Sequence, residues 1–171
     1  MTKNIVYDNF ADYPLDHWIW PNFSPVEMAC RGDGLLKIDR AAMTKLQALR
    51  NALDKPIYVN SAYRSPTYNT RIGGAKHSVH MDAKAFDISM SNHDPIVFEY
   101  EARRAGFTGF GYYPESNFMH IDTGRERSWG DPFPNNQSAP EPATGNATPK
   151  PTTDKSKVSK MSPSMRRKYG Q

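Results

Sequence analysis

The chain contains a single cysteine, Cys30, among its 171 residues. One thiol cannot form an internal disulfide, and it cannot supply the several thiolates of a cysteine-rich zinc site. Any metal ion that the protein binds must therefore be held by histidine, aspartate or glutamate side chains.

Long apolar runs are also missing. No stretch approaches the roughly 20 consecutive apolar residues of a membrane span. The N-terminal sequence MTKNIVYDNFADYPLDHW mixes acids with aromatics, whereas a secretory signal peptide begins with basic residues and continues with an apolar segment. We therefore expect no membrane span and no signal peptide. The protein is expected to be made in the cytoplasm and to reach any target outside the cell by another release route.

Most of the chain lacks an excess of positive charge. The formal net charge is +4, but seven of the 22 basic residues and only two of the 18 acidic residues lie in residues 135–171. Residues 1–134 consequently carry a net charge of −1. Binding of nucleic acid by a basic face of the folded domain is therefore not expected.

Residues 135–171 differ in composition from the rest of the chain. They contain five prolines, many Ser, Thr and Lys residues and almost no large aliphatic side chains. Such a segment buries too little apolar surface to offset its loss of conformational entropy on folding. We predict a folded domain over residues 1–134 and a disordered basic tail over residues 135–171. The tail is either a solvated linker or an arm that contacts a virion or another anionic surface.

Helix signals occur at three places. In SPVEMA, Ser24 and Glu27 form a capping-box pattern around a proline at the first helical position. Asp39 precedes a longer segment whose apolar residues recur every three or four positions, and that segment ends before Pro56. Asp94 opens a third helix, which runs to about residue 105 and ends at a glycine.

Strand signals occur in IYVNSAYR, AFDISM, GFTGFGYY and NFMHID, and the last two segments are separated by a short turn. Strands and helices do not alternate regularly, which argues against a doubly wound parallel sheet. The predicted fold class is α+β, with a mostly antiparallel sheet flanked by helices.

Two strand-like segments place ionisable side chains on one face. In AFDI, Asp87 points away from the apolar neighbours on either side of it, and in FMHID the same alternation puts His120 and Asp122 together. Burying such groups without a partner is costly, and a divalent cation is an effective partner. Asp87 and His120, together with His80, which lies seven residues before Asp87, form a candidate zinc site of three ligands with a fourth position open to solvent.

The segments around these residues resemble a known family. SAYRSPTYN (61–69), GGAKHSVHMDAKAFDI (73–88) and GFGYYPESNFMHIDTG (109–124) are similar to signature segments of the zinc D-alanyl-D-alanine carboxypeptidases. That family shares a fold with L-alanyl-D-glutamate endopeptidases and the N-terminal signalling domain of hedgehog proteins. NFSPVEMACRGDG (22–34) is similar to its entry segment, so the likeness covers about residues 22–130.

The resemblance implies a hedgehog-like fold and one Zn²⁺ ion bound by His80, Asp87 and His120. It also implies that Arg64 lies beside the metal and holds a carbonyl or carboxylate of the substrate. A guanidinium group remains charged and can stabilise the oxyanion that forms when water attacks an amide. The alternative for Arg64 is an arginine in a surface turn.

Two other side chains are candidates for substrate binding. Ser78 either hydrogen-bonds the substrate or a metal ligand, or caps its loop. Tyr113, together with Tyr112, either lines a peptide cleft or packs in the core. His77 is close enough to the site in sequence to touch a substrate, although its place in a loop also explains it. His17 and His93 lie in polar segments and are expected to be exposed.

The general base is harder to assign. Several relatives carry an acid three residues before the last histidine ligand, where this chain has Asn117. We assign the base to Asp122, two residues after His120, with Glu115 as the second choice. Asp122 could instead be a buried acid that fixes the orientation and tautomer of a ligand histidine.

These observations predict a zinc metallopeptidase that hydrolyses peptide bonds in the stem peptides of bacterial peptidoglycan. Removal of a terminal D-alanine and cleavage within a stem or crosslink are both compatible with the sequence. The protein is interpreted as a phage lysin or a virion-associated wall enzyme. The alternative is a non-catalytic, zinc-containing binding or structural module of a virion on the same fold.

Overall fold

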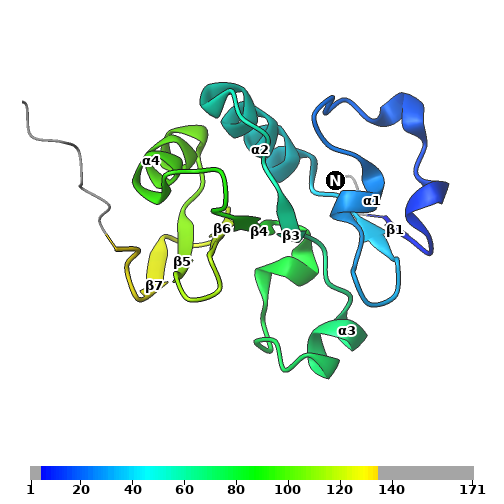
Figure 1. Ribbon diagram of the computed structural model, residues 1–171. Helices are drawn as coiled ribbons and strands as arrows, with labels where there is room; N and C mark the ends of the chain where they lie inside the picture. Colours follow the sequence, from blue (N-terminus) through cyan, green and yellow to red (C-terminus); the bar gives the residue numbers. More distant parts are fainter. Residues whose placement is uncertain (1–4, 135–171) are drawn as a thin grey trace, which may run out of the picture. The chain divides into compact units, whose positions relative to one another are not determined.

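The computed structural model describes residues 5–134 (Figure 1). Its centre is a five-stranded sheet with the strand order β3-β4-β6-β5-β7. A second sheet of two short strands pairs β1 with β2 near the N-terminus. The strands are β1 (Val6–Tyr7), β2 (Leu36–Lys37), β3 (Val59–Ser61), β4 (Ala85–Ser89), β5 (Gly109–Tyr113), β6 (Phe118–Asp122) and β7 (Arg127–Gly130).

Neighbouring strands in the large sheet are antiparallel except at one edge. The pairs β3–β4, β4–β6 and β5–β6 are antiparallel, whereas β7 runs parallel to β5. The hairpin between β5 and β6 turns at Asn117, whose positive φ of 50° asparagine tolerates better than most residues. Helices and a mixed sheet occur together in this fold, so the α+β prediction is confirmed.

The three predicted helices are confirmed, and side chains cap them as expected. Glu27 accepts a hydrogen bond from the Ser24 backbone N–H (2.8 Å), and Asp39 accepts one from the Ala42 N–H (2.9 Å). The Asp94 side chain likewise accepts hydrogen bonds from backbone N–H groups at the start of the third helix, which ends at Gly106 with φ 98°. These helices are α1 (Pro25–Met28), α2 (Arg40–Leu53) and α4 (Pro95–Ala105).

Several short helices were not predicted. Helix α3 (Pro66–Arg71) begins after Ser65, whose hydroxyl accepts from the Tyr68 N–H (3.0 Å), directly after the segment IYVNSAYR that was interpreted as a strand. Three 3₁₀ turns complete the fold: η1 (Phe10–Asp12), η2 (Leu15–His17) and η3 (Val79–Asp82). Each spans one turn or a little more, which is too short for a periodic apolar pattern to be visible.

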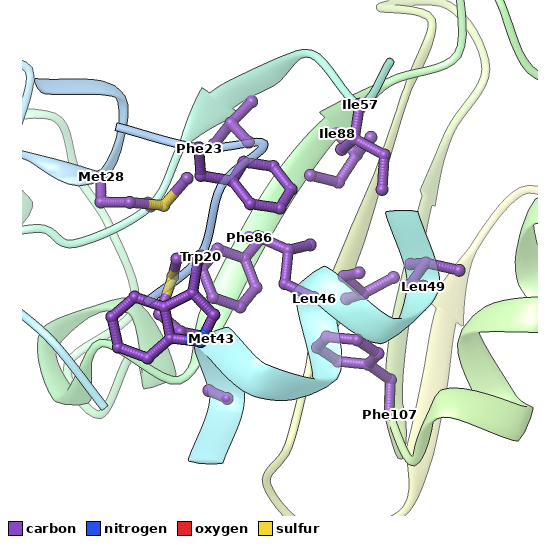
Figure 2. Packing of buried hydrophobic residues seen from close by; sticks show 14 of the residues in the cluster. Trp20, Phe23, Met28, Met43, Leu46, Leu49, Ile57, Phe86, Ile88 and Phe107 are labelled. Carbon is purple, nitrogen blue, oxygen red and sulfur yellow. The ribbon is translucent and has the colours of Figure 1, made fainter. Parts of the chain in front are cut away.

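Helices α2 and α4 cover one face of the large sheet (Figure 1). Figure 2 shows α2 contributing Leu46 and Leu49 to a core that also contains Phe86 and Ile88 of β4. Trp20, from the irregular N-terminal segment, is 2% exposed and packs in the same cluster. Each fully buried aliphatic or aromatic side chain contributes about 1.5–3 kcal/mol to stability. The apolar residues on this face of the sheet therefore stabilise the fold, and polar groups can occupy the opposite face.

The predictions for two histidines have different outcomes. The His17 side chain is 65% exposed, as expected. The prediction for His93 is wrong, because its residue is only 8% exposed and its Nε2 atom lies 2.9 Å from the carbonyl oxygen of Pro56. The ring of Phe98 packs beside it, with a centroid separation of 5.2 Å. A carbonyl partner and an aromatic neighbour compensate for burying the imidazole.

The prediction of a disordered tail over residues 135–171 falls outside the described residues. Within residues 5–134, none of the helices has the length and apolar character that a bilayer crossing requires.

Candidate active site

The three candidate metal ligands, which lie far apart in sequence, converge on one point. His80 comes from η3, Asp87 from β4 and His120 from β6. The Nε2 atom of His80 lies 3.2 Å from both Asp87 Oδ1 and His120 Nδ1, and those two atoms are 2.9 Å apart. All three residues are buried. The fold thus brings together the ligand set that the sequence and its resemblance indicated.

In each ligand histidine, the hydrogen bond made by the ring nitrogen that points away from the other ligands determines which nitrogen is free to bind a metal. His80 Nδ1 lies 2.6 Å from the carbonyl oxygen of Ala62, which can only accept, so Nδ1 carries the proton and Nε2 presents a lone pair. His120 Nε2 lies 2.8 Å from Asp122 Oδ2, which directs the Nδ1 lone pair of the neutral ring toward Asp87. Two imidazole lone pairs and a carboxylate oxygen therefore face one another. A cation between them would satisfy all three groups.

The donor set fits zinc. Zinc takes imidazole nitrogen and carboxylate oxygen at about 2.0–2.2 Å in tetrahedral geometry, which places neighbouring ligand atoms about 3.3–3.5 Å apart. The three separations here, 2.9–3.2 Å, are shorter by a few tenths of an ångström. Three protein ligands leave one coordination position, as in catalytic rather than structural zinc sites.

Burial and hydrogen bonding act in opposite directions on the pKa values of these groups. Burial alone raises the pKa of Asp87, but its close contacts with the His120 and His80 imidazoles outweigh burial and leave the pKa below its ordinary value. Burial also lowers the pKa of His120, yet its bonds to Asp122 and Asp87 leave that pKa raised. For His80, burial dominates and the pKa is lowered, which keeps this imidazole neutral and able to bind a metal.

Asp122 lies behind His120 rather than in the open part of the site. Its side chain is fully buried and accepts hydrogen bonds from His120 Nε2, from both Nη atoms of Arg127 (3.1 and 2.7 Å) and from the Gly124 N–H (2.8 Å). Burial raises its pKa, but these donors lower it to about 2. The geometry therefore matches the alternative considered for Asp122, an acid that orients a ligand histidine. It does not bring Asp122 to a position from which it could take a proton from a substrate water.

Two glycines on β5 create the room for this arrangement. Gly109 and Gly111 are the cross-strand partners of Asp122 and His120. A Cβ atom at Gly109 would lie 2.3–2.5 Å from the Asp122 carboxylate, and one at Gly111 would lie 2.6 Å from the Trp129 indole. The site face of β5 is thus bare backbone at these two positions, and the carboxylate and the indole occupy the space that side chains would otherwise fill.

Arg64 is anchored at the site by its own hydrogen bonds. Its Nη2 atom donates to Asp87 Oδ2 (2.6 Å), and its Nε atom donates to the Ser61 hydroxyl (3.0 Å). Its backbone N–H donates to the carbonyl oxygen of His80 (3.2 Å). This bond connects the segment after β3 to η3, which carries His80. The guanidinium lines the cleft described below, so the alternative of a remote surface turn does not match its position.

A cleft of about 780 Å³ opens over the three ligands. Among the sequence candidates, Arg64, Ser78 and Tyr113 line it, whereas Glu115 is exposed in the β5–β6 turn and does not. The remaining lining residues are Gly73, Gly74, Ala75, His77, Val79, Phe118, Arg125, Arg127 and Trp129, together with the ligands themselves.

An aromatic wall forms one side of the cleft. Trp129 Nε1 donates to the Tyr113 hydroxyl (2.9 Å), and the Trp129 ring lies 5.0 Å from that of His120. Tyr113 stacks on Phe118, with ring centroids 4.4 Å apart and planes 9° apart. Strand β7, which carries Trp129, was not predicted from the sequence. The short strand signal RSWG, two residues after Thr123-Gly124, was the available clue.

Comparison with known proteins agrees with this geometry. Residues 21–122 match the model of a family described as Peptidase M15. The chain belongs to the peptidase M15 family. The matched region contains all three metal ligands and Arg64, whereas Arg125, Arg127 and Trp129 lie beyond its end.

The similar proteins include enzymes that act on bacterial cell walls. The chain is 40% identical over 94 residues to the zinc D-Ala-D-Ala carboxypeptidase of Streptomyces albus G, covering 53% of this chain and 37% of that protein. It is 37% identical over 111 residues to the peptidoglycan L,D-endopeptidase MepK of Escherichia coli K12, covering 58% of each. A probable MepK of Haemophilus influenzae is 40% identical over 86 residues, covering 47% of this chain and 45% of that protein. The chain thus spans less than two thirds of these relatives.

Proposed function

We propose that this M15 protein is a zinc-dependent peptidase that hydrolyses peptide bonds in the stem peptides of bacterial peptidoglycan. The observation that carries the proposal is the convergence of His80, Asp87 and His120 in the lining of a cleft of about 780 Å³. The relatives from Streptomyces albus G and Escherichia coli, named for activity on D-Ala-D-Ala and peptidoglycan, support the choice of substrate.

The residues of the cleft have distinct roles in this proposal. His80, Asp87 and His120 would hold the metal, which when bound supplies Lewis acidity and lowers the pKa of water. Arg64 directs its guanidinium into the cleft from a fixed position beside Asp87 and stabilises negative charge on the carbonyl oxygen of the scissile bond. Asp122 and Arg127 keep His120 in the orientation that presents Nδ1 to the metal.

Proton transfer to the leaving amine requires a group that reaches the cleft. Asp122 is fully buried, and Glu115 does not line the cleft. His77 is exposed on the loop that forms the cleft wall, and among the described residues outside the ligand set it is the imidazole with access to a bound peptide. We assign the proton transfer to His77.

The experiment that tests the proposed function is digestion of purified peptidoglycan, followed by mass spectrometry of the released fragments. Release of D-alanine would identify a carboxypeptidase, and cleaved stems or crosslinks would identify an endopeptidase. Either activity should disappear on addition of a chelator, return with zinc and be absent from His120→Ala. Intact peptidoglycan after incubation with the zinc-loaded protein would contradict the proposal.

A second candidate, a zinc-containing binding module without activity, is favoured by one observation. Position 117 is an asparagine, and Asp87 is the one carboxylate among the described residues that line the cleft. Zinc binding without cleavage of any wall preparation would select this candidate. The hedgehog-like fold, the role as a phage lysin or virion-associated enzyme, and contact of residues 135–171 with a virion stay predictions.

A further inference from the structure

The cleft contains more positive charge than the metal site requires. Three arginines line it, Arg64, Arg125 and Arg127, whereas Asp87 is its one acidic residue among residues 5–134. A bound divalent cation would add further positive charge. A cleft whose lining carries one sign of charge concentrates ligands of the opposite sign.

Two of the three arginines are committed to buried carboxylates. Arg64 pairs with Asp87 at 2.6 Å. Arg127 donates through both Nη atoms to Asp122, and its guanidinium also lies 4.8 Å from the centre of the Trp129 ring. Both side chains therefore help to build the site, and each guanidinium is already paired with a carboxylate of the protein.

The third arginine, Arg125, is different. It is exposed, and its side chain forms no ion pair or hydrogen bond with the part of the chain that the structure describes. Its neighbour Glu126 is also exposed but does not line the cleft. An arginine in a solvated turn could show the same lack of partners, so its position relative to the cleft decides the interpretation.

The backbone that carries Arg125 is held in place on both sides. The Gly124 carbonyl accepts a hydrogen bond from the Thr108 hydroxyl (2.6 Å), and the Gly124 N–H donates to Asp122 Oδ1 (2.8 Å). The Arg125 carbonyl accepts from Arg127 Nη1 (3.1 Å). Hydrogen bonds thus fix the backbone at Arg125, and its guanidinium, which has no partner among the described residues, lies at the wall of the cleft. Such a group binds carboxylates by charge-assisted, often bidentate hydrogen bonds.

We infer that Arg125 determines substrate specificity by binding a free carboxylate of the peptide in the cleft. This inference rests on the proposed peptidase function and narrows it. The protein should prefer peptides that carry a free carboxylate near the scissile bond over otherwise identical peptides with a carboxamide at that position. Arg125 lies in the segment between β6 and β7, outside the region matched by the family.

The test uses the full-length, zinc-loaded protein and a panel of stem peptides in which each free carboxylate is replaced in turn by a carboxamide. At one position, the wild type should hydrolyse the carboxylate peptide with a five- to tenfold higher kcat/KM than its carboxamide counterpart, an effect of about the size of one exposed charge-assisted hydrogen bond. Arg125→Gln should lose this difference through a higher KM for the carboxylate peptide, with kcat and the carboxamide peptide unchanged.

Two variants serve as controls for charge. Arg104→Gln removes an arginine on α4 that is 65% exposed and does not line the cleft, and it should leave the preference intact. Arg125→Lys keeps the charge but not the bidentate geometry, and it should retain part of the preference. Equal loss in Arg125→Gln and Arg104→Gln would overturn the inference, because it would show a non-specific effect of net charge.

Equilibrium binding separates this inference from the proposed function. Peptides whose scissile amide is replaced by a non-hydrolysable bond are titrated into the wild type and Arg125→Gln by calorimetry. Arg125-dependent preference for the carboxylate form, in a protein that cleaves no peptidoglycan, would support the inference while the proposed function fails. Cleavage of peptidoglycan with the same preference for the carboxylate peptide in the wild type and in Arg125→Gln would overturn the inference and leave the proposed function standing.

Discussion

Asp87 on β4 and His120 on β6 lie directly opposite each other, and Asp87 Oδ1 is 2.9 Å from His120 Nδ1. The register of two antiparallel strands therefore brings together two of the three ligands before any metal binds. A slip of one residue would turn Asp87 to the helix-covered face of the sheet. The apolar residues Phe86 and Ile88, buried on that face, hold the register that the site needs.

Zinc should stabilise the fold through these ligands. A ligand present at about 1,000 times its dissociation constant stabilises the folded state by about 4 kcal/mol, which corresponds to roughly 10 °C in Tm for a domain of this size. Calorimetric scans in excess zinc and in excess chelator should differ by this amount for the wild type. The difference should vanish in His120→Ala and persist in His17→Ala, which removes an exposed histidine. Equal Tm values for the wild type in both buffers would contradict a metal site.

Asp122 should control metal affinity rather than act as the catalytic base. Asp122→Asn keeps the size of the side chain but weakens the acceptor that holds His120 Nε2. Loss of such an orienting carboxylate typically lowers metal affinity by about 10–100-fold. Competition with a chromophoric chelator measures this affinity. Asp82→Asn, at an acid whose side chain is 67% exposed, is the matched control. Unchanged zinc affinity in Asp122→Asn would argue against the orienting role.

The same carboxylate should make the metal-free protein sensitive to acid. The pKa of Asp122 is lowered from 3.8 to about 2 in the folded state, so between these values the unfolded chain binds more protons than the folded one. Stability from this group is present above pH 3.8 and is lost as the pH falls toward 2. The loss amounts to roughly 2 kcal/mol.

Urea denaturation in chelator, at pH 5 and near pH 2, measures this loss. Asp122→Asn cannot take up the proton and should lose less stability than the wild type over the same interval. The raised pKa of His120 affects stability near and above its ordinary value of 6.5, so it does not enter this window. The same pH dependence in both proteins would show that Asp122 is not ionised in the folded state as described.

The elements that could be predicted from the sequence are those with a local signal. Asp39 and Asp94 mark helix starts because their carboxylates accept bonds from backbone N–H groups two or three residues later. Asp87 could be placed on the polar face of its strand because strand residues alternate. The strand β7 gave a weaker signal, since RSWG is short and its parallel pairing with β5 depends on residues distant in sequence.

The role of Asp122 could not be decided from the sequence because it depends on two other strands. Alternation correctly puts Asp122 on the same face as His120. Whether that face is open at Asp122 depends on Arg127 of β7, which covers the carboxylate with its guanidinium, and on Gly109 of β5, which leaves room for it. Neither contact has a local signature, so the sequence left both roles for Asp122 open.

The two glycines on β5 should respond differently to an added methyl group. At Gly109→Ala the new Cβ would collide with the Asp122 carboxylate, whereas at Gly111→Ala it would meet the Trp129 ring. Overpacking of this kind typically costs about 1–3 kcal/mol of stability. Both variants should be destabilised, but Gly109→Ala should lose more zinc affinity, because it displaces the partner of His120. Chemical denaturation and chelator competition on both variants check this, and equal zinc affinities would contradict it.

His77 should be needed for turnover but not for metal binding. It lines the cleft from an exposed loop, three residues before the ligand His80. Loss of a general acid or base typically lowers kcat by about 10²–10⁴-fold. His77→Gln should therefore show a large fall in kcat on a stem peptide, with little change in zinc affinity or Tm, because the wild-type side chain is exposed. His17→Gln, at an exposed histidine outside the cleft, should retain the wild-type kcat. If His77→Gln also keeps the wild-type kcat, the proton must be transferred by another group that reaches the bound peptide.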